Sequence, residues 1–505
     1  MKRIAAVAAI LSLAACAVGP NYYPALGPRG ASGKFDAAAR VVFDQSDAPA
    51  VWWRLYNDPV LDKLIEQAFI NNTDIRVANA NLRQARAVLS ESRAGRLPTT
   101  TTSGSAEYRR FGGYQASGAT FGGGATGTSG IPAKPRATFQ SEVFSAGLDV
   151  SYEIDLFGRI TRLIQASRAD YEALAAVRDT TRITVAAETA RAYADACSAA
   201  AQIAVARQSL DVQNQTFDLT ERLYTAGRGT PLDVARARAQ LETTRATVPG
   251  FVAARQGGLY RLAVLTGQTP ETVIPEANAC NRAPLLARPL PVGDGAALLR
   301  RRPDIREADR RFAAETARIG VAKADLFPRI TIGGGVSSSA FKVGDLGKSA
   351  SVAYNIGPLL SWSFPNISVV LARITQAKAS AEAAVATYDG TVLAALQETE
   401  EALANYAGER DRNEALRAAR DQSAEAVRIV RLRYGAGAES FINVLDSERT
   451  LSTANADLAA SDAQLVTNQI AVFKALGGGW ETAPEPVVQP YHGRLRHRLP
   501  GDIVG

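Results

Sequence analysis

The sequence carries the same pattern twice, 210 residues apart. The stretch Leu223–Gly227 (LYTAG) returns as Arg433–Gly437 (RYGAG), and the same register joins Gly267 to Gly477. Upstream of residue 99 the offset becomes 230, since Pro98 recurs as Pro328. A repeat of this length excludes a short solenoid period. It predicts two copies of a complete supersecondary unit within one assembly.

The extra residues of the first copy lie in the Gly-rich stretch Gly112–Gly130, which we expect to enlarge one loop. The composition fits long helices packed side by side, because 46% of the residues are hydrophobic, only 7% are aromatic and Ala is abundant. The net charge of +7 is scattered along the chain. Because no block of Lys and Arg stands out, we expect no nucleic-acid partner.

The amino terminus predicts secretion. Lys2 and Arg3 precede the apolar run Ile4–Leu13, and Leu13–Cys16 (LAAC) forms a small-residue cleavage site. We expect residues 1–15 to be a signal peptide and Cys16 to carry an N-acyl and a diacylglycerol lipid, with no other cofactor. Ala17, and not Asp, follows Cys16, and in enteric-type lipoprotein sorting this resembles an outer-membrane destination. The alternative is an ordinary signal peptide in which the Cys is incidental. A disulfide between Cys197 and Cys280 is permitted in this compartment, but the sequence does not decide it.

Each repeat is expected to contain one β-hairpin, at residues 99–157 and 329–365. Apolar and polar residues alternate strictly from Ala146 to Leu156, and apolar residues again occupy every second position from Val352 to Phe364, over the length of a tilted membrane strand. Weaker strands, Thr99–Arg110 and Arg329–Ser338, come before them. Four strands cannot close a barrel, and lipid does not tolerate open edges. Either the hairpins form a soluble sheet, or several chains pool them. The signal peptide and the alternation favour pooling.

The rest of each repeat reads as helix. Residues 159–223 contain neither Pro nor Gly, and residues 367–434 contain only Gly390 and Gly408. Each stretch would form a helix of about 100 Å. Shorter helices are expected at residues 60–97, 231–266, 296–327 and 441–476. Two short helices stacked end to end would then run beside each long one. The Ala-rich stripes predict close lateral packing, with a long hairpin or coiled coil as the alternative.

Seven motifs in this order resemble one family, the TolC-like outer-membrane efflux factors, in their NodT-like lipoprotein branch. The motifs are Cys16–Tyr22, Trp53 with Asp58–Pro59 and Leu64–Ile65, Asp155–Arg159, Arg301–Ile305, Ala324–Pro328, Tyr434 with Gly437, and Leu445–Asp446 with Arg449. The resemblance implies an α+β membrane channel. Three chains would form a homotrimer with a 12-stranded β-barrel in the outer membrane lipid and a 12-helix periplasmic α-barrel.

The resemblance also implies a function and its partners. The channel would be the passive exit duct for a periplasmic adapter protein and an inner-membrane pump. A resistance-nodulation-division pump is favoured over a type I exporter. The expected domains are the signal peptide 1–15, the anchored segment 16–57, repeat 1 at 58–267, a linker at 268–295, repeat 2 at 296–477 and a tail at 478–505.

Two Gly-containing turns join long to short helices, at residues 225–230 and 435–440. Gly supplies the left-handed backbone that such a reversal needs. On their own, these turns are adequately explained as simple connectors. By resemblance they are the periplasmic tips that dock the adapter, and the residues to which we assign this role are Arg222, Gly227, Thr230, Arg431 and Gly437.

The residues after the second turn predict a gate. Ile442, Asp446 and Arg449 lie at i, i+4 and i+7, on one helix face. In a trimer they would form an apolar, an acidic and a basic ring, a common basis of selectivity and constriction. The alternative is a solvated tip with a surface ion pair worth under about 1 kcal/mol. By resemblance, Asp233 and Tyr434 form a latch, while Asn443 and Glu439 depart from residues found in some relatives.

The sequence does not predict an enzyme. The chain has two His residues, both in the tail, and it has no Gly-Lys-Thr phosphate loop and no cluster of metal ligands. The remaining alternative is a trimeric, surface-anchored coiled-coil adhesin or tether. Such a protein would not need the two strand hairpins or the matched turns.

Overall fold

The computed structural model describes residues 17–111, 139–272, 275–286 and 288–486. The signal peptide, Cys16, the Gly112–Gly130 loop and the end of the tail therefore lie outside the described residues. The chain divides into two compact units. The first unit is drawn from residues 1–22, 87–168 and 314–381, and the second from residues 23–86, 169–313 and 382–505. Each unit therefore combines parts of both repeats.

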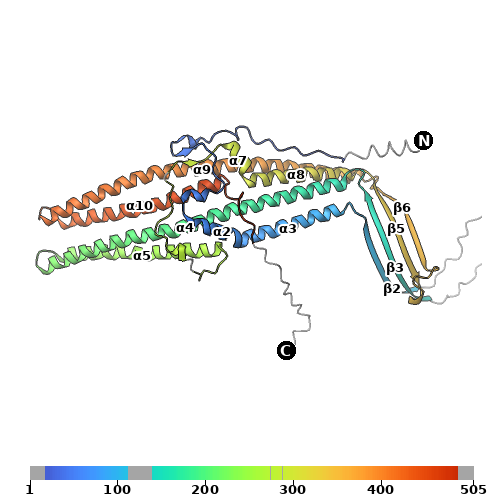
Figure 1. The fold of residues 1–505 in the computed structure, drawn as a ribbon, viewed down its shortest axis with the longest axis horizontal. Coiled ribbons are helices and arrows are strands. Elements are labelled where there is room, and N and C mark those ends of the chain that lie inside the picture. The colour runs from blue at the N-terminus through green and yellow to red at the C-terminus, as the bar shows by residue number, and fades with distance from the viewer. Residues whose placement is uncertain (1–16, 112–138, 273–274, 287, 487–505) are drawn as a thin grey trace, which may run out of the picture. The chain divides into compact units, whose positions relative to one another are not determined.

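The element order confirms the internal duplication (Figure 1). The first copy consists of α2 (Pro59–Asn71), α3 (Thr73–Ala94), β2 (Thr99–Phe111), β3 (Phe139–Ile154), α4 (Arg159–Thr225) and α5 (Pro231–Leu265). The second consists of α7 (Gly295–Arg301), α8 (Pro303–Ala324), β5 (Arg329–Ala340), β6 (Val352–Ser361), α9 (Ile367–Gly435) and α10 (Phe441–Ala475). The non-repeated segments hold η2 (Ala37–Ala39), β1 (Phe43–Asp44), η3 (Trp52–Tyr56), α6 (Pro275–Asn278) and β4 (Leu290–Pro291), and η4 (Val343–Asp345) lies between β5 and β6.

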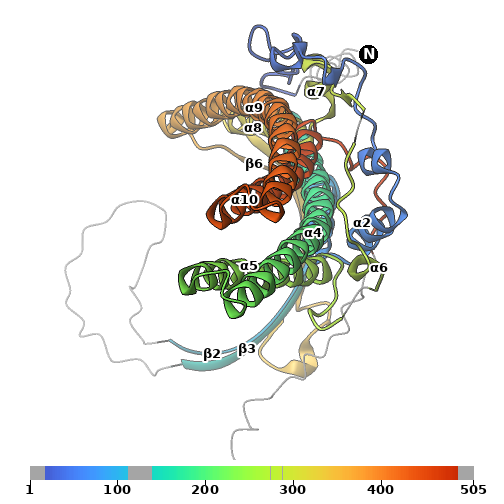
Figure 2. The same cartoon turned by 90° about the vertical axis from the view of Figure 1, so that its left-hand side faces the viewer.

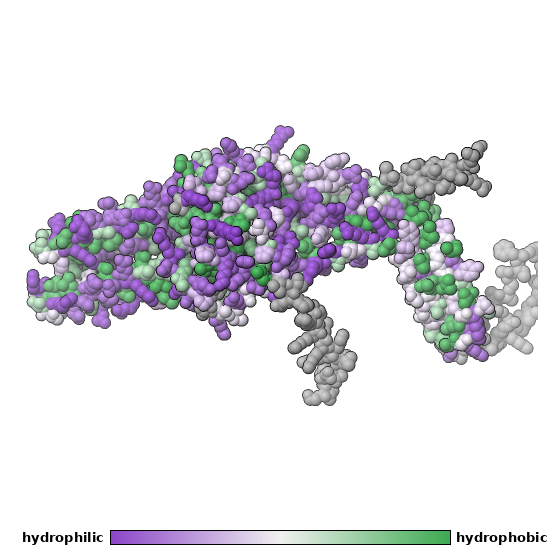
Figure 3. All heavy atoms as spheres, in the orientation of Figure 1, coloured by the Kyte–Doolittle hydropathy of each residue, from purple (hydrophilic) through white to green (hydrophobic). Residues whose placement is uncertain are grey.

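The first unit contains one four-stranded antiparallel sheet, in the order β2-β3-β5-β6. Both predicted hairpins are present, and β3 pairs with β5 to join them, for example through Tyr152 and Ile332. The predicted strand is present as β3, and Leu148, Val150 and Tyr152, which alternate along it and so share one face, are all exposed. Figure 3 shows hydrophobic side chains gathered over these strands.

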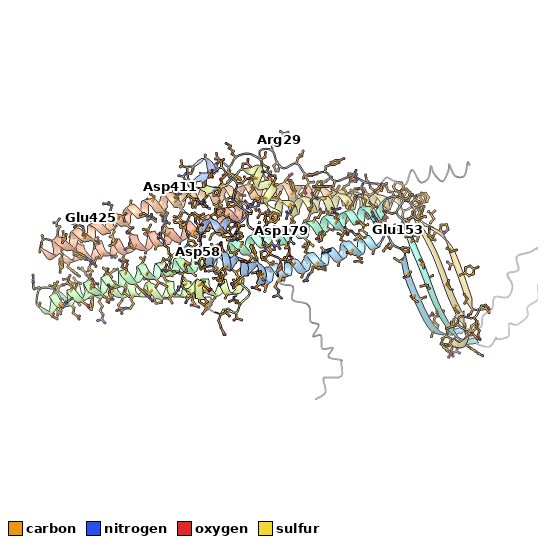
Figure 4. All side chains as sticks on the ribbon, in the orientation of Figure 1. Arg29, Asp58, Glu153, Asp179, Asp411 and Glu425 are labelled. Carbon is orange, nitrogen blue, oxygen red and sulfur yellow. A yellow bond between two sulfur atoms is a disulfide. The ribbon has the colours of Figure 1, made fainter. Side chains whose placement is uncertain are left out.

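The turn between β3 and α4 is fixed by local side chains. The Asp155 carboxylate accepts hydrogen bonds from the backbone N–H groups of Ile160 and Thr161, and so caps the amino terminus of α4. Glu153, labelled in Figure 4 at the end of β3, accepts two hydrogen bonds from Arg159 at 2.7 and 2.8 Å. Phe157, in this turn, stacks on Phe327, which lies between α8 and β5, with ring centroids 4.4 Å apart.

In the second unit the helices lie side by side in the order α9, α10, α4, α5, which both Figure 1 and Figure 2 show. Small residues allow close packing where α5 crosses α4. A Cβ placed on Gly258 would lie 3.0 Å from the backbone nitrogen of Ala196. The hydrophobic core of this unit contains Trp52, which stacks on Phe473 with ring centroids 5.1 Å apart. The parallel strand pair β1–β4 and the side chain of Gln469 hold the linker against it.

The two leading short helices differ from the prediction. Each was expected to be continuous, over residues 60–97 and 296–327, and each is broken. Asn72 separates α2 from α3, because its buried side-chain oxygen accepts from the N–H groups of Asp74 and Ile75 and starts a new helix there. Arg302 separates α7 from α8, because it precedes Pro303 and adopts extended backbone.

Cys197 and Cys280 form a disulfide, which answers a question that the sequence left open. Cys197 is fully buried on α4, and Cys280 follows α6 in the linker. The bond joins positions 83 residues apart. In the described part of the chain, no helix combines the length and the apolar character needed to cross a membrane. Across these same residues, no group of three His, Cys, Asp or Glu side chains is placed to hold a metal ion.

Candidate gate and docking tips

The two turns between long and short helices have the same backbone structure. Gly227 and Gly437 have φ angles of +72° and +74°, the left-handed conformation expected at these positions. Gly227 N–H donates to Tyr224 O at 2.9 Å, and Gly437 N–H donates to Tyr434 O at the same distance. A second bond follows in each turn, from Arg228 to Leu223 and from Ala438 to Arg433. This pair of bonds is the Schellman motif that ends a helix.

Beyond the turns, the two copies begin their next helix differently. The Thr230 hydroxyl accepts from Asp233 N–H, while the Asp233 carboxylate accepts from Thr230, so the two residues form a capping box with Pro231 at the first helical position. At the second tip, Glu439 accepts a hydrogen bond from the Asn443 side chain at 2.6 Å. The hydrogen bond from Asn443 lowers the pKa of the Glu439 carboxyl, and the Ser440 N–H lowers it further.

The structure brings the two expected latch residues near each other. Burial raises the pKa of the Tyr434 hydroxyl above its usual value, and the negative charge of Asp233 raises it further. The Tyr434 ring also packs against Phe441, with ring centroids 5.8 Å apart. Asp233 is meanwhile engaged by the Thr230 hydroxyl at 2.6 Å. Asp233 therefore acts on Tyr434 through its negative charge. The hydrogen-bond partner of the Asp233 carboxylate is Thr230.

The three expected gate residues lie on the surface of α10. The side chains of Asp446 and Arg449 are 70% and 69% exposed and approach to 3.6 Å. Ile442 is 45% exposed, a high value for a large apolar side chain. Within one chain the pair is a weak surface ion pair. An apolar side chain and an ion pair exposed together on one helix face are suited to contact a further copy.

Of the expected docking residues, Arg431 has a specific partner within its own chain. Its guanidinium donates twice to one oxygen of Glu448, at 2.6 and 3.0 Å. Arg222 donates to the backbone oxygen of Asp218 within its own helix. Gly227 and Gly437 have no atom within 4 Å of the position where a Cβ would lie, so both glycines stand free in the described structure.

Glu448 is a functional candidate that the sequence reasoning missed. Its side chain is 1% exposed. Besides Arg431, it accepts a hydrogen bond from the Thr216 hydroxyl at 3.1 Å and one from the Gln213 amide at 3.5 Å. One carboxylate therefore connects α4, α9 and α10. The available signal was its position, because Glu448 lies four residues after Val444 and three after Leu445, on the apolar stripe of α10.

A cleft of about 570 Å³ lies between the two tips. Residues of α4, α9 and α10 line it together with both turns, among them Thr216, Leu223, Arg228, Arg431, Tyr434 and Glu448. It offers charged groups of both signs, an aromatic ring and apolar walls. Such a lining suits a polypeptide segment that carries both polar and apolar side chains.

Comparison with known proteins decides the family. The family model described as "Outer membrane efflux protein" matches residues 64–268 and 296–478. The chain belongs to the outer membrane efflux protein family. Its match covers both repeats and omits the linker between them. The protein is therefore a channel of the bacterial outer membrane rather than an enzyme, and the resemblance drawn from the seven motifs is confirmed.

Individual relatives match over nearly the whole chain. "Nodulation protein T" of Rhizobium leguminosarum bv. trifolii is 29% identical over 473 residues, 93% of this chain and 96% of the relative. "Toluene efflux pump outer membrane protein TtgC" of Pseudomonas putida is 30% identical over 444 residues, 86% of this chain and 87% of the relative. Among solved structures, the outer-membrane channel OprN is 36% identical with a TM-score of 0.81, over 92% of this chain and 100% of that one.

Proposed function

We propose that this family member is the exit duct of a tripartite efflux system. Three copies close one tunnel, an adapter protein docks at its tips, and an inner-membrane pump, of the resistance-nodulation-division type, delivers the cargo. The observation that carries the proposal is the pair of open edges of the β2-β3-β5-β6 sheet. Unpaired edge strands are costly in lipid, and three copies of four strands remove them by closing a barrel.

The pump partnership draws on the relatives. TtgC is named as the outer membrane protein of an efflux pump. This chain shares its family and nearly its full length, so an equivalent partnership is the simplest function for the two exposed tips. Arg222, Gly227, Thr230 and Gly437 provide the docking surface, and Arg431 contributes to it through the cleft wall. The lipid anchor at Cys16 adds to the hold of the strands on the membrane. The adhesin or tether considered from the sequence is set aside, because the family is one of efflux channels.

The gate in this proposal has two layers. Ile442, Asp446 and Arg449 of three chains meet around the tunnel axis and constrict it. Behind them, the Glu448 contacts to α4 and α9 hold α10 in place. The charge of Asp233 at the first tip also acts on Tyr434 at the second tip. Opening then requires α10 to shift relative to α4, so the bonds that join these two helices resist opening.

Conductance of the purified protein in planar bilayers tests the proposal. The parent channel should show small, mostly closed openings. The variant Asp446→Ala removes the proposed acidic ring and should give larger or longer openings. The matched control is Asp457→Ala, an exposed acidic residue further along α10, which should behave as the parent. Membranes that stay silent for all three proteins would contradict the duct. Equal conductance in Asp446→Ala and the parent would remove Asp446 from the gate.

A further inference from the structure

A buried arginine lies beside the first described residues of the chain. Arg162, in the first turn of α4, is 4% exposed. Its guanidinium donates to the backbone oxygens of Val18, Ala17 and Gly19 at 3.1 to 3.2 Å. It also donates to the side-chain oxygens of Asn21 and Gln165 at 3.1 and 2.9 Å. Among the described residues, these five acceptors are all neutral, and four of them belong to the segment Ala17–Asn21.

A carboxylate is the usual partner of a buried guanidinium, because it offsets the cost of removing the charge from water. Arg162 instead uses its rigid fork of donors to bind a run of backbone oxygens. Burial accordingly lowers the pKa of the Arg162 guanidinium below its usual value. An arrangement of this kind recognises the path of a peptide backbone rather than the identity of its side chains.

The walls around the segment are shaped to admit a backbone closely. A Cβ on Gly19 would lie 2.5 Å from the Cα of Gly320, and a Cβ on Gly320 would lie 2.7 Å from the Cγ of Arg162. Gly158 has a φ of +76°, and a Cβ there would overlap Ala17. Val18 N–H also donates to Phe157 O at 3.2 Å. Glycines from both repeats therefore make the space that the segment occupies.

We propose that Arg162, Gly158 and Gly320 form a receptor site for the segment Ala17–Asn21, and that this site fixes where the lipid on Cys16 enters the membrane relative to the strands. The inference rests on the proposed acylation of Cys16. Ala17 is bonded directly to Cys16, so binding of Ala17 by Arg162 restricts where the lipid anchor can lie. Arg162 is the positioning residue, and it lies in the first turn after β3. The acyl chains therefore start beside the ends of the strands.

Hydrogen exchange of the Val18 amide in the full-length chain, reconstituted in lipid bilayers, tests the site. In Arg162→Met the exchange should accelerate by at least about tenfold, because hydrogen bonds to a charged group are among the stronger ones in proteins. Gly320→Ala should accelerate it as well. The control is Gly390→Ala in α9, another helical glycine, where a Cβ would meet nothing within 4 Å. It should match the parent.

A gain-of-function variant keeps the test decisive if Arg162→Met fails to fold. Asn21→Asp places a carboxylate beside the guanidinium, and it should slow Val18 exchange below the parent rate. A nitroxide on Pro20→Cys reports the same segment, since it should be immobile in the parent and mobile in Gly320→Ala. Unchanged Val18 exchange in a folded Arg162→Met, or no slowing in Asn21→Asp, would overturn the proposal.

The lipid is tested separately. The mass of the amino-terminal peptide reports whether Cys16 is acylated, and Cys16→Ser removes the lipid. If Val18 stays protected in Cys16→Ser, the receptor site holds the segment by itself, as proposed. If protection disappears with the lipid, the membrane and not Arg162 orders the segment, and the inference fails while the duct function stands. If the parent carries no lipid, the proposed anchor fails, and the Val18 result still reports on the site.

Discussion

At the scale of single residues, Glu448 is the buried charged residue near the tips that connects α10 to its neighbouring helices. A carboxylate that is 1% exposed needs partners to offset its desolvation, and Glu448 has them on two neighbouring helices, α4 and α9. The sequence places Glu448 on an apolar stripe without revealing why. Its partners are 17 and 232 positions away, and only the folded chain brings them together.

We expect Glu448→Gln to destabilise the tip. Losing one partner of a buried pair costs about 3–5 kcal/mol at most, and less here because Arg431 is 43% exposed and can turn to water. The variant should lower the thermal unfolding midpoint and raise the open probability in bilayers. Asp446→Asn is the matched control for stability, since the exposed Asp446–Arg449 pair contributes under about 1 kcal/mol. Equal unfolding midpoints for the two variants would contradict the role of Glu448.

Glu439 gives a prediction on pH. The Asn443 side chain and the Ser440 N–H lower the folded-state pKa of Glu439 below its ordinary value of 4.5. A lowered folded-state pKa means that this contribution to stability is complete above the ordinary value and declines only as pH falls through the lower one. Titration of Glu439 should therefore cause no change in hydrogen exchange at the second tip between pH 6 and 8. Glu439→Gln should match the parent at low pH and differ from it at pH 7.

At the scale of elements, local chemistry made most of the secondary structure predictable. Gly227 and Gly437 end the long helices as expected, and Pro98 and Pro328 directly precede β2 and β5. The breaks at Asn72 and Arg302 were not predicted. An Asn inside an apolar-periodic run reads as an ordinary surface residue, and its capping role depends on burial, including the bond from its amide to Leu265 O. The disulfide was unpredictable for a similar reason, since both partners are remote in sequence.

Removing the disulfide should destabilise the second unit. Closing a chain segment of this length restricts the unfolded state, and the loss of such a bond typically costs about 2–4 kcal/mol. Cys280→Ser should lower the thermal unfolding midpoint, and Cys197→Ser/Cys280→Ser should lower it by a similar amount, because either change removes the same bond. If a reducing agent leaves the midpoint of the parent unchanged, the bond does not stabilise the fold in this way.

At the scale of the whole molecule, the sequence predicted the duplication and the family. The duplication was predictable from two kinds of repeated feature. These are the two glycine turns in register and the two stretches of alternating apolar residues, Ala146–Leu156 and Val352–Phe364. What the sequence does not contain is the pairing of β3 with β5, which turns two hairpins into one sheet. That pairing depends on contacts between strands separated by the whole of α4 and α5. In the proposed trimer, the open edges β2 and β6 are where the copies meet.

The trimer can be tested at those edges. A cysteine at Ser103 on β2, combined in turn with one at Ala353, Asn355 or Gly357 on β6, should form disulfides between copies in the membrane. Gel analysis without reductant should show a ladder that ends at three chains. The same scan between β3 and β6, which are not neighbours in the sheet, serves as the control. A ladder beyond three chains, or bonds formed only within one chain, would contradict the closed trimer.

The contacts of the final described residues bear on the timing of folding. The Trp480 indole donates to the backbone oxygen of Arg301, and the Arg306 guanidinium lies over the Trp480 ring at 4.6 Å. Glu485 binds Arg182, which also contacts the buried Asp179 labelled in Figure 4. Ribosomes make these residues after both repeats. The corner between α7 and α8 therefore cannot reach its final packing until the chain has been synthesised past residue 485, and a product truncated before that point is left with an unfinished surface there.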